Sequence, residues 1–356
     1  MICHHGAGRF AGLSVDAYNL ELEENGGFVG DRVRSKAFVA ILDDLRSEAR
    51  RTGADPLDGV ASADRPTLDT LLERQGTPAA DLIGQAVDAY ADAFADVVRR
   101  FLAAEPWQGT QHVVVGGGLR ESRVGEEAIR RADFLLQAGG HAVALRPIHL
   151  HPDEAALIGA LHLRPVHLAG PEAILAVDIG GSNVRAGVVL PDRGGEHTTV
   201  VMREHWRHGQ EGTDRDGLVD RITSMLASLA DRARRDGLAL APFVGLGCPG
   251  EIRPDGTITG GTQNLPGDWQ ENGFNLPERV RAALPPFGGT EATVILHNDA
   301  VLQGLSELSR MREVARWGVL TIGTGLGNAR FTTTTTGRPG EETKPLRPTR
   351  DLEIPG

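Results

Sequence analysis

The feature that most constrains this chain is residues 173–190, where two apolar runs flank a short polar turn. The runs 174–177 and 186–190 are typical of buried strands. The first run leads directly into Asp178, so the pattern predicts a strand that carries a carboxylate to a hairpin tip.

The turn itself has an unusual combination of groups. Gly180 and Gly181 permit backbone conformations and close approaches that a side chain would block, and Ser182 adds a hydroxyl. A carboxylate, bare backbone N–H groups and a hydroxyl suit a metal-bound polyphosphate. An ordinary glycine-rich hairpin, in which Asp178 only stabilises the turn, explains this stretch equally well.

Length and composition limit the classes of function. A chain of 356 residues can bury two domain cores. A net charge of −11 argues against a nucleic-acid surface, which needs a basic patch. No apolar run approaches the ~20 residues of a spanning helix, and the N-terminus lacks a signal-peptide core. We therefore expect a cytoplasmic protein with no membrane or nucleic-acid partner.

Cysteine and lysine usage exclude several kinds of site. Cys3 and Cys248 are the only cysteines, too few for a multi-cysteine zinc site. The only lysines are Lys36 and Lys344, and neither follows a GxxxxG loop or lies in a kinase-like strand. Phosphate binding here would depend on backbone amides, arginine, a helix N-terminus or a metal.

Helices and strands are predicted to alternate along the chain. Predicted helices cover residues 31–51, 68–72, 79–104, 122–137, 153–163, 217–235, 276–284 and 301–312. Further strands are predicted at 113–115, 142–145, 243–247, 293–296 and 318–322. Residues 1–30 are glycine-rich and patternless, and 332–356 are predicted to be a mobile tail. The alternation predicts an α/β architecture.

Polar signals follow four of the predicted strands. They are Asp178 with its glycine turn, Asn298-Asp299, Gly323-Thr324-Gly325-Leu326-Gly327, and Gly116-Gly117-Gly118. Folds of this class place ligands at strand ends, so we expect these residues to share one site.

These segments together resemble the sugar kinases of the ROK family (repressor, open reading frame, kinase), within the hexokinase–actin ATPase superfamily. Gly245 to Glu251 and Asn264-Leu265-Pro266 add to the likeness, which covers roughly 80–165 and 173–330. The resemblance implies a two-lobed actin-like ATPase (ribonuclease H-like) fold. It also implies a glucokinase-like transfer of phosphate from ATP, with Mg²⁺, to a hydroxyl of a hexose or amino sugar, and a homodimer.

The resemblance also assigns roles. Asp299 would be the general base, Asn298 and Asn264 would bind sugar hydroxyls, and Asp178 would hold Mg²⁺ through water. The phosphates would contact Gly180, Gly181, Ser182, Asn183, Gly323, Thr324, Gly325 and Gly327, and the adenosine would pass Gly116, Gly117 and Gly118. The alternatives are a helix N-cap for Asp299 and ordinary turn chemistry for the asparagines.

The order of the segments differs from that of the family. The triple-glycine strand and the helix after it come last in the family but precede the first hairpin here. The simplest account is a circular permutation joined through Arg164 to Glu172. The predicted units are 1–152 (substrate and adenosine lobe), 153–172 (crossing helix and linker), 173–297 (first phosphate lobe), 298–331 (catalytic Asp and second phosphate hairpin) and 332–356 (tail).

Other departures bear on activity. The family's zinc loop is missing, so no zinc is expected, and so is its Gly-Glu-Ile-Gly-His sugar clamp. Leu13, after Phe10-Ala11-Gly12, stands where the clamp glutamate would be. Asn328 and Ala329 replace glycines of the second turn, and the turn is expected to survive because asparagine tolerates left-handed geometry.

These departures leave an alternative open: a non-catalytic ROK-like protein that binds a sugar or nucleotide. A kinase of another small substrate is a third possibility. The sequence also leaves open which sugar is used, whether ATP or polyphosphate is the donor, and whether residues 1–78 rebuild the clamp. Cys3-His4-His5 and His149 with His151 are weak metal candidates, because a loose terminus and the lack of a third ligand argue against them.

Overall fold

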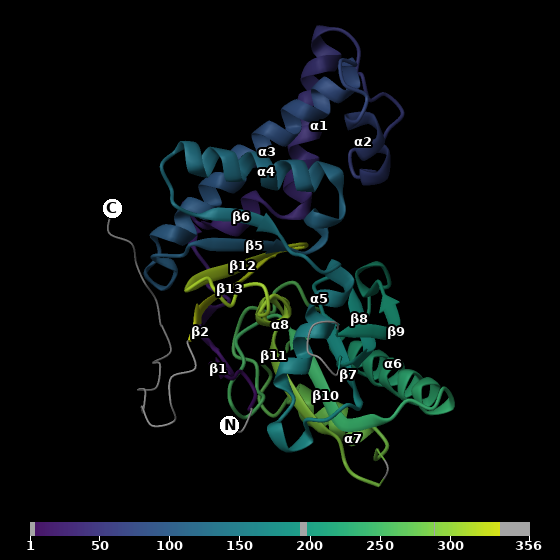
Figure 1. The fold of residues 1–356 in the computed structure, drawn as a ribbon. Helices are drawn as coiled ribbons and strands as arrows, with labels where there is room; N and C mark the ends of the chain where they lie inside the picture. The colour runs from purple at the N-terminus through teal and green to yellow at the C-terminus, as the bar shows by residue number, and fades with distance from the viewer. Residues whose placement is uncertain (1–3, 193–197, 288, 335–356) are drawn as a thin grey trace.

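Two β-sheets with helices between and outside them form the molecule (Figure 1). The computed structural model describes residues 4–192, 198–287 and 289–334. In this part of the chain no helix is both long and apolar enough to cross a bilayer. The mixed α/β architecture expected from the alternation of elements is confirmed.

The five-stranded sheet carries the first glycine turn. In spatial order its strands are β11 (Thr293–Asn298), β10 (Leu240–Cys248), β7 (Ala173–Ile179), β8 (Val184–Leu190) and β9 (Thr199–Trp206). β7, β8 and β9 form an antiparallel meander. β10 lies parallel to β7, and β11 lies parallel to β10.

The six-stranded sheet carries the second glycine turn. In spatial order its strands are β1 (Arg9–Phe10), β2 (Leu13–Tyr18), β13 (Leu326–Thr333), β12 (Arg316–Ile322), β5 (His112–Gly116) and β6 (Ala144–Pro147). β12, β13 and β2 form an antiparallel meander. β5 lies parallel to β12, and β6 lies parallel to β5.

Apart from the added β1, the two sheets therefore have the same strand order and directions. In the five-stranded sheet these strands follow one another along the chain. In the six-stranded sheet the strands equivalent to β7 and β8 are β12 and β13, which come from the end of the described chain. The strands equivalent to β9, β10 and β11 are β2, β5 and β6, which come from its beginning. The break falls between β13 and β2, where Thr333 is the register partner of Leu13. The backbone N–H of Thr334 donates to the carbonyl of Gly12 at 3.0 Å.

Helices fill three layers around the sheets (Figure 1). They are α1 (Ser35–Thr52), α2 (Arg65–Leu72), α3 (Pro78–Ala103), α4 (Arg123–Ala138), α5 (Pro152–Gly159), α6 (Arg215–Arg235), α7 (Leu276–Ala283) and α8 (Asp299–Ser306). A two-stranded hairpin, β3 (Glu23–Glu24) with β4 (Gly27–Phe28), precedes α1.

Three apolar cores hold the layers together. α1 to α4 pack on the outer face of the six-stranded sheet, and α6 and α7 pack on the outer face of the five-stranded sheet. α5 and α8 share the core between the sheets, to which alternate residues of β7 and β12 also contribute. α5 follows β6 and α8 follows β11, so each sheet supplies one of these two central helices at the equivalent place.

Most predicted elements are confirmed, with shifted ends. The predicted helix 301–312 ends at Ser306, and the helix predicted from residue 31 begins at Ser35. The prediction that residues 1–30 lack structure was wrong, since they contain β1 to β4. β13 ends at Thr333, so the start of the predicted tail belongs to a strand, and its remainder, from residue 335, lies outside the described residues.

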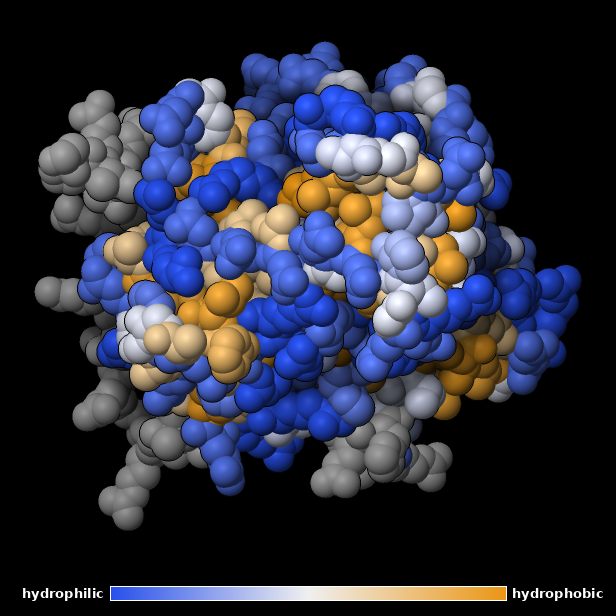
Figure 2. Space-filling view, turned by 90° about the horizontal axis from the view of Figure 1, so that it is seen from above, coloured by the Kyte–Doolittle hydropathy of each residue, from blue (hydrophilic) through white to orange (hydrophobic). Residues whose placement is uncertain are grey.

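The surface has no single dominant apolar area in the view from above, where hydrophilic residues separate several smaller apolar patches (Figure 2). The large apolar side chains that are exposed, within the described ranges, are Phe28, Phe134, Val166 and Val201. They belong to different elements, and such scattered residues are ordinary for a folded protein.

Candidate active site

A cleft with a cavity volume of about 880 Å³ lies between the two sheets and collects nearly all of the candidate residues. Its lining includes Asp178, Gly180, Gly181, Ser182, Asn183, Asn264, Asp299, Gly323, Thr324, Gly325, Gly327, Gly117 and Gly118. The loops and helix ends that bear them follow β7, β10, β11, β12 and β5. Each of the four strand-end signals thus contributes residues to one cavity, although Asn298 and Gly116 do not line it, and the chemical roles of these residues remain predictions.

The first turn, between β7 and β8, is closed by a 2.8 Å hydrogen bond from the Gly180 N–H to the Asn183 carbonyl. Neither Gly180 nor Gly181 has a left-handed φ, so backbone freedom does not explain these glycines. Close approach explains Gly181. A Cβ at that position would lie 2.9 Å from the Cβ of Asn264 and 3.3 Å from the Cβ of Thr324.

The second turn, between β12 and β13, meets the first one directly. The hydroxyls of Ser182 and Thr324 lie 2.8 Å apart, within hydrogen-bond distance. A Cβ on Gly325 would lie 2.7 Å from the side-chain nitrogen of Asn264. The Asn264 side chain thus lies between the two turns, and its proposed contact with a sugar remains a prediction.

Asp178 and Asp299, the two acidic residues singled out by the sequence, both line this cleft. Asp178, the last residue but one of β7, is buried, and burial raises its pKa to about 6. Asp299 is the first residue of α8 and is partly buried. Burial, and then the negative charge of Asp178, raise the pKa of Asp299 to about 7. A carboxylate with a pKa near neutrality is suited to accept a proton at physiological pH.

An arginine that sequence reasoning missed connects this region to α5. Arg185, on β8, places Nη1 3.6 Å from a carboxylate oxygen of Asp178. Its Nε donates to the carboxylate of Asp153 in the first turn of α5. Arg185 also lines the cleft, so a positive charge lies beside the first glycine turn. The sequence places Arg185 in the strand directly after the glycine turn, but a single arginine in a strand does not by itself indicate a phosphate site.

Asn298 has a structural role in addition to any role with substrate. Its side-chain oxygen accepts hydrogen bonds from the N–H groups of Ala300 and Val301 at 3.0 and 3.3 Å. Its amide nitrogen donates to the carbonyl of Gly250 at 3.2 Å. Asn298 is therefore the N-cap of α8, and Asp299 is not. Asn298 does not line the cleft, and its contact with a sugar remains a prediction.

Close packing explains two of the three glycines at the end of β5, Gly116 and Gly117. Gly117 has a left-handed φ of 78°, and a Cβ there would lie 2.7 Å from the backbone nitrogen of Ile322. Gly116 lies against the side chain of Gln303 on α8, whose buried Oε1 has no hydrogen-bond partner among the described residues. Gln303 lines the cleft and is a further residue that the sequence did not reveal.

The second turn is present as expected, but Asn328 does not form it through left-handed geometry. Asn328 was expected to tolerate left-handed geometry in the second turn, but it lies within β13 and pairs with Leu320. Asn19 and Asn25 are the residues other than glycine that have a positive φ in the described ranges. The side chain of Asn328 instead holds the backbone of Leu20, donating to its carbonyl at 2.9 Å and accepting from its N–H at 3.0 Å.

The two weak metal candidates have other partners in the structure. His5 Nδ1 accepts the backbone N–H of Leu296 at 3.0 Å, so this histidine has a structural partner, and Cys3 lies outside the described residues. His151 comes close to Glu121 and Asp153, with one ligand atom of each within 4.8 Å of the others. Asp153 already pairs with Arg185, and the positive end of α5 disfavours a cation there.

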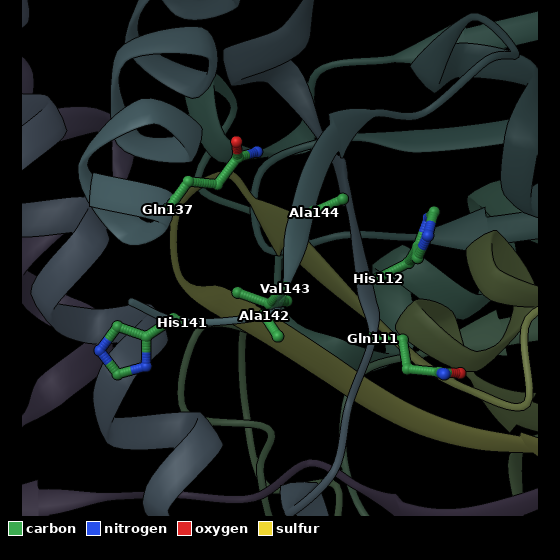
Figure 3. A pocket seen from close by; sticks show the side chains of 7 residues that line it. All are labelled: Gln111, His112, Gln137, His141, Ala142, Val143 and Ala144. Atoms are coloured by element: carbon green, nitrogen blue, oxygen red, sulfur yellow. The ribbon is translucent and has the colours of Figure 1, made fainter. Parts of the chain in front are cut away.

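A shallower hollow of about 470 Å³ lies at the edge of the six-stranded sheet, between β5 and the segment leading into β6 (Figure 3). Gln111, His112, Gln137 and residues 141–144 line it. It contains no carboxylate and neither glycine turn. The cleft between the sheets is therefore the candidate active site.

The sequence matches no protein-family model and no curated protein. Three solved structures give partial matches. A Listeria monocytogenes protein described as an N-acetylmannosamine kinase is 27% identical, with a TM-score of 0.34, over 45% of this chain and 47% of that one. A Cytophaga hutchinsonii protein described as a sugar kinase is 22% identical, with a TM-score of 0.33, over 45% and 48%.

The third match is a ROK family glucokinase from Streptomyces griseus, solved with glucose and AMPPNP. It is 22% identical, with a TM-score of 0.33, over 47% of each chain. The chain thus spans about half the length of the structures it matches. Over a little less than half of its length, this chain is similar to solved sugar kinases, one of which belongs to the ROK family that the sequence motifs resemble.

Proposed function

We propose that this protein is an ATP-dependent kinase of a sugar hydroxyl, with Asp299 as the general base. The observation that carries the proposal is the presence of Asp178, Asp299 and both glycine turns in one cleft. Phosphoryl transfer needs positioned phosphates, neutralised charge and an in-line nucleophile, and little covalent chemistry from the protein. The two turns provide backbone N–H groups and hydroxyls, and Asp299 provides the proton acceptor.

Each group has a defined task in this proposal. Asp299 takes the proton of the attacking sugar hydroxyl, which is why its raised pKa matters. Arg185 and the glycine turns bind the phosphates. Asp178 would hold Mg²⁺ through water, and the donor set fits, because a hard cation prefers carboxylate oxygen and would offset the repulsion between the two carboxylates. The metal would neutralise phosphate charge.

An ADP-release assay tests the proposal. The full chain is incubated with Mg-ATP, or with polyphosphate, and a panel of hexoses and amino sugars, and reactions without sugar serve as the control. Sugar-dependent turnover would support the kinase and identify its substrate. ATP binding without turnover on any sugar would instead favour the non-catalytic, ligand-binding alternative.

The pKa of Asp299 predicts how turnover depends on pH. Burial and the charge of Asp178 hold this pKa at about 7, so the ionised form needed for proton transfer is scarce below that pH. We expect kcat/KM for the sugar to rise about tenfold per pH unit below pH 7 and to level off above it. Initial rates at saturating Mg-ATP measure this profile. A rate that is constant across this range would contradict the assignment of Asp299 as the base.

We further propose that the chain is a circular permutant of the two-lobed kinase fold. The matching strand order of the two sheets supports this, since the six-stranded sheet takes strands from both ends of the described chain whereas the five-stranded sheet does not. Thr333 and Leu13 are paired neighbours, so the missing connection between β13 and β2 would be a simple hairpin. The segment 164–172 would then be the join that the permutation introduced.

Restoring the family order tests the permutation. The rearranged chain starts at Pro171, runs to Gly356, continues through Met1 and ends at Gly170. Because loop-closure entropy depends weakly on loop length, we expect its free energy of unfolding to stay within about 2 kcal/mol of that of the natural order. Urea unfolding monitored by circular dichroism measures it. A rearranged chain that does not fold would contradict the proposal.

A further inference from the structure

Residues 19–22 form one continuous part of the cleft lining. This segment leaves the end of β2, and Asn19, Leu20, Glu21 and Leu22 all line the cavity that contains Asp299. Asn19 has a left-handed φ of 53°, a backbone conformation that asparagine adopts more readily than other residues with a side chain.

Asn328 holds this segment in place. The Asn19 N–H donates to the backbone carbonyl of Asn328 at 3.0 Å. The side chain of Asn328 binds both the N–H and the carbonyl of Leu20. Asn328 is itself buried and lies near the second glycine turn, so the turn and the segment are coupled through one residue.

The segment reaches the opposite side of the cleft through two contacts. The Gln263 side-chain nitrogen donates to a carboxylate oxygen of Glu21 at 2.6 Å. Gly261 lies against the amide of Asn19, and a Cβ at Gly261 would lie 2.8 Å from the Asn19 Cγ. The loop that carries Gly261 and Gln263 also contains Gly250, whose carbonyl accepts a hydrogen bond from Asn298, the neighbour of Asp299.

We infer that Asn19, Glu21 and Gln263 form the substrate clamp of this cleft, recognising adjacent hydroxyls of a sugar. This inference rests on the proposed function. A carboxylate accepts two hydroxyl hydrogens, and primary amides both donate and accept, so the three side chains together match a polyhydroxylated ligand. The clamp glutamate expected at residue 13 is absent, and Leu13 is only 1% exposed, so this position contributes nothing to the cleft.

Two pairs of matched variants test the clamp in the full chain. Glu21→Gln removes the carboxylate charge, and Glu23→Gln makes the same change two residues away, outside the cleft lining. Asn19→Gly removes the amide while keeping the left-handed backbone available. Asn25→Gly is its control, because Asn25 has a nearly identical φ of 52° and lies in the exposed β3–β4 hairpin.

We expect Glu21→Gln and Asn19→Gly each to raise KM for the sugar about tenfold, with KM for ATP unchanged and kcat within about threefold. The control variants should match the natural protein. Unchanged KM for the sugar in both test variants, or a rise in KM for ATP instead, would overturn the clamp while leaving the kinase proposal intact.

Calorimetric titration with the same sugars separates the clamp from the kinase activity. Sugar binding that weakens in the two test variants would support the clamp, whether or not the natural protein shows turnover. If the natural protein binds the sugar but does not turn it over, only the kinase proposal is overturned. If no sugar binds to the natural protein and none is turned over, both proposals are wrong.

Discussion

Replacement of Asp299 by asparagine is expected to lower kcat about 100- to 10,000-fold, the usual contribution of a general base. The variant keeps the shape of the side chain and its acceptor oxygen at the start of α8, but it cannot take a proton. KM for ATP should change little, because the glycine turns and Arg185 are untouched. ADP release at saturating sugar and Mg-ATP measures the effect.

The stability of this variant gives an independent check. The folded state raises the pKa of Asp299 from 3.8 to about 7, so it binds the proton more tightly than the unfolded state does. The free energy of unfolding that depends on this residue is therefore largest below about pH 4 and is lost as the pH rises to about 7. The asparagine side chain of the variant carries no charge at any pH, so Asp299→Asn should equal or exceed the natural protein in melting temperature at pH 8.

Asp44→Asn, on the exposed face of α1, is the matched control, and it should leave both turnover and melting temperature unchanged. A fall in activity that accompanies a fall in stability would instead point to a structural role for Asp299. Activity close to that of the natural protein would contradict its assignment as the base.

Gly159→Ala is expected to lower the free energy of unfolding by about 3 kcal/mol, at the upper end of the usual cost of overpacking. Gly159 ends α5, where that helix packs against α8. A Cβ there would overlap the backbone carbonyl of Leu302, with the Leu302 carbonyl carbon only 2.7 Å away. Because the obstacle is backbone, the two helices must separate.

Since α8 begins with Asp299, the displacement should also reduce kcat, and a shift of about 1 Å at a reacting group can cost 100-fold. Gly84→Ala in α3 is the control, because a Cβ there meets nothing within 4 Å. It should stabilise the protein by about 0.4–1 kcal/mol by restricting the unfolded chain. Urea unfolding of both variants provides the comparison, and equal effects would contradict the packing argument.

Much of the site could be predicted because its parts are local in the sequence. The strand, turn and strand around Asp178 are specified by apolar runs and glycines within 18 residues. Asn298 is the last residue of the apolar strand β11, and Asp299 directly follows it. Parallel strands have their carboxyl ends at the same edge of a sheet, so the polar residues that follow these strands were expected to lie close together.

Residues 1–30 could not be predicted in the same way. β2 has two buried residues, Leu13 and Val15, and it becomes a strand because β13 supplies its partner from more than 300 residues away. The clamp segment that follows it depends on Asn328, whose function cannot be seen without that pairing. The contact of Asn328 with Leu20 could not be predicted for this reason, since its local sequence indicated only a turn.

The sequence by itself therefore determined the α/β class, most of the helices and strands, and which residues lie at strand ends. These follow from periodicity and turn chemistry, which act over a few neighbouring residues. Only the tertiary structure decided that Asn264 lies between the two glycine turns, that Arg185 reaches Asp178, and that Glu21 meets Gln263 across the cleft. These contacts join residues brought together by sheet pairing and by the packing of α5 on α8, and no local pattern encodes them.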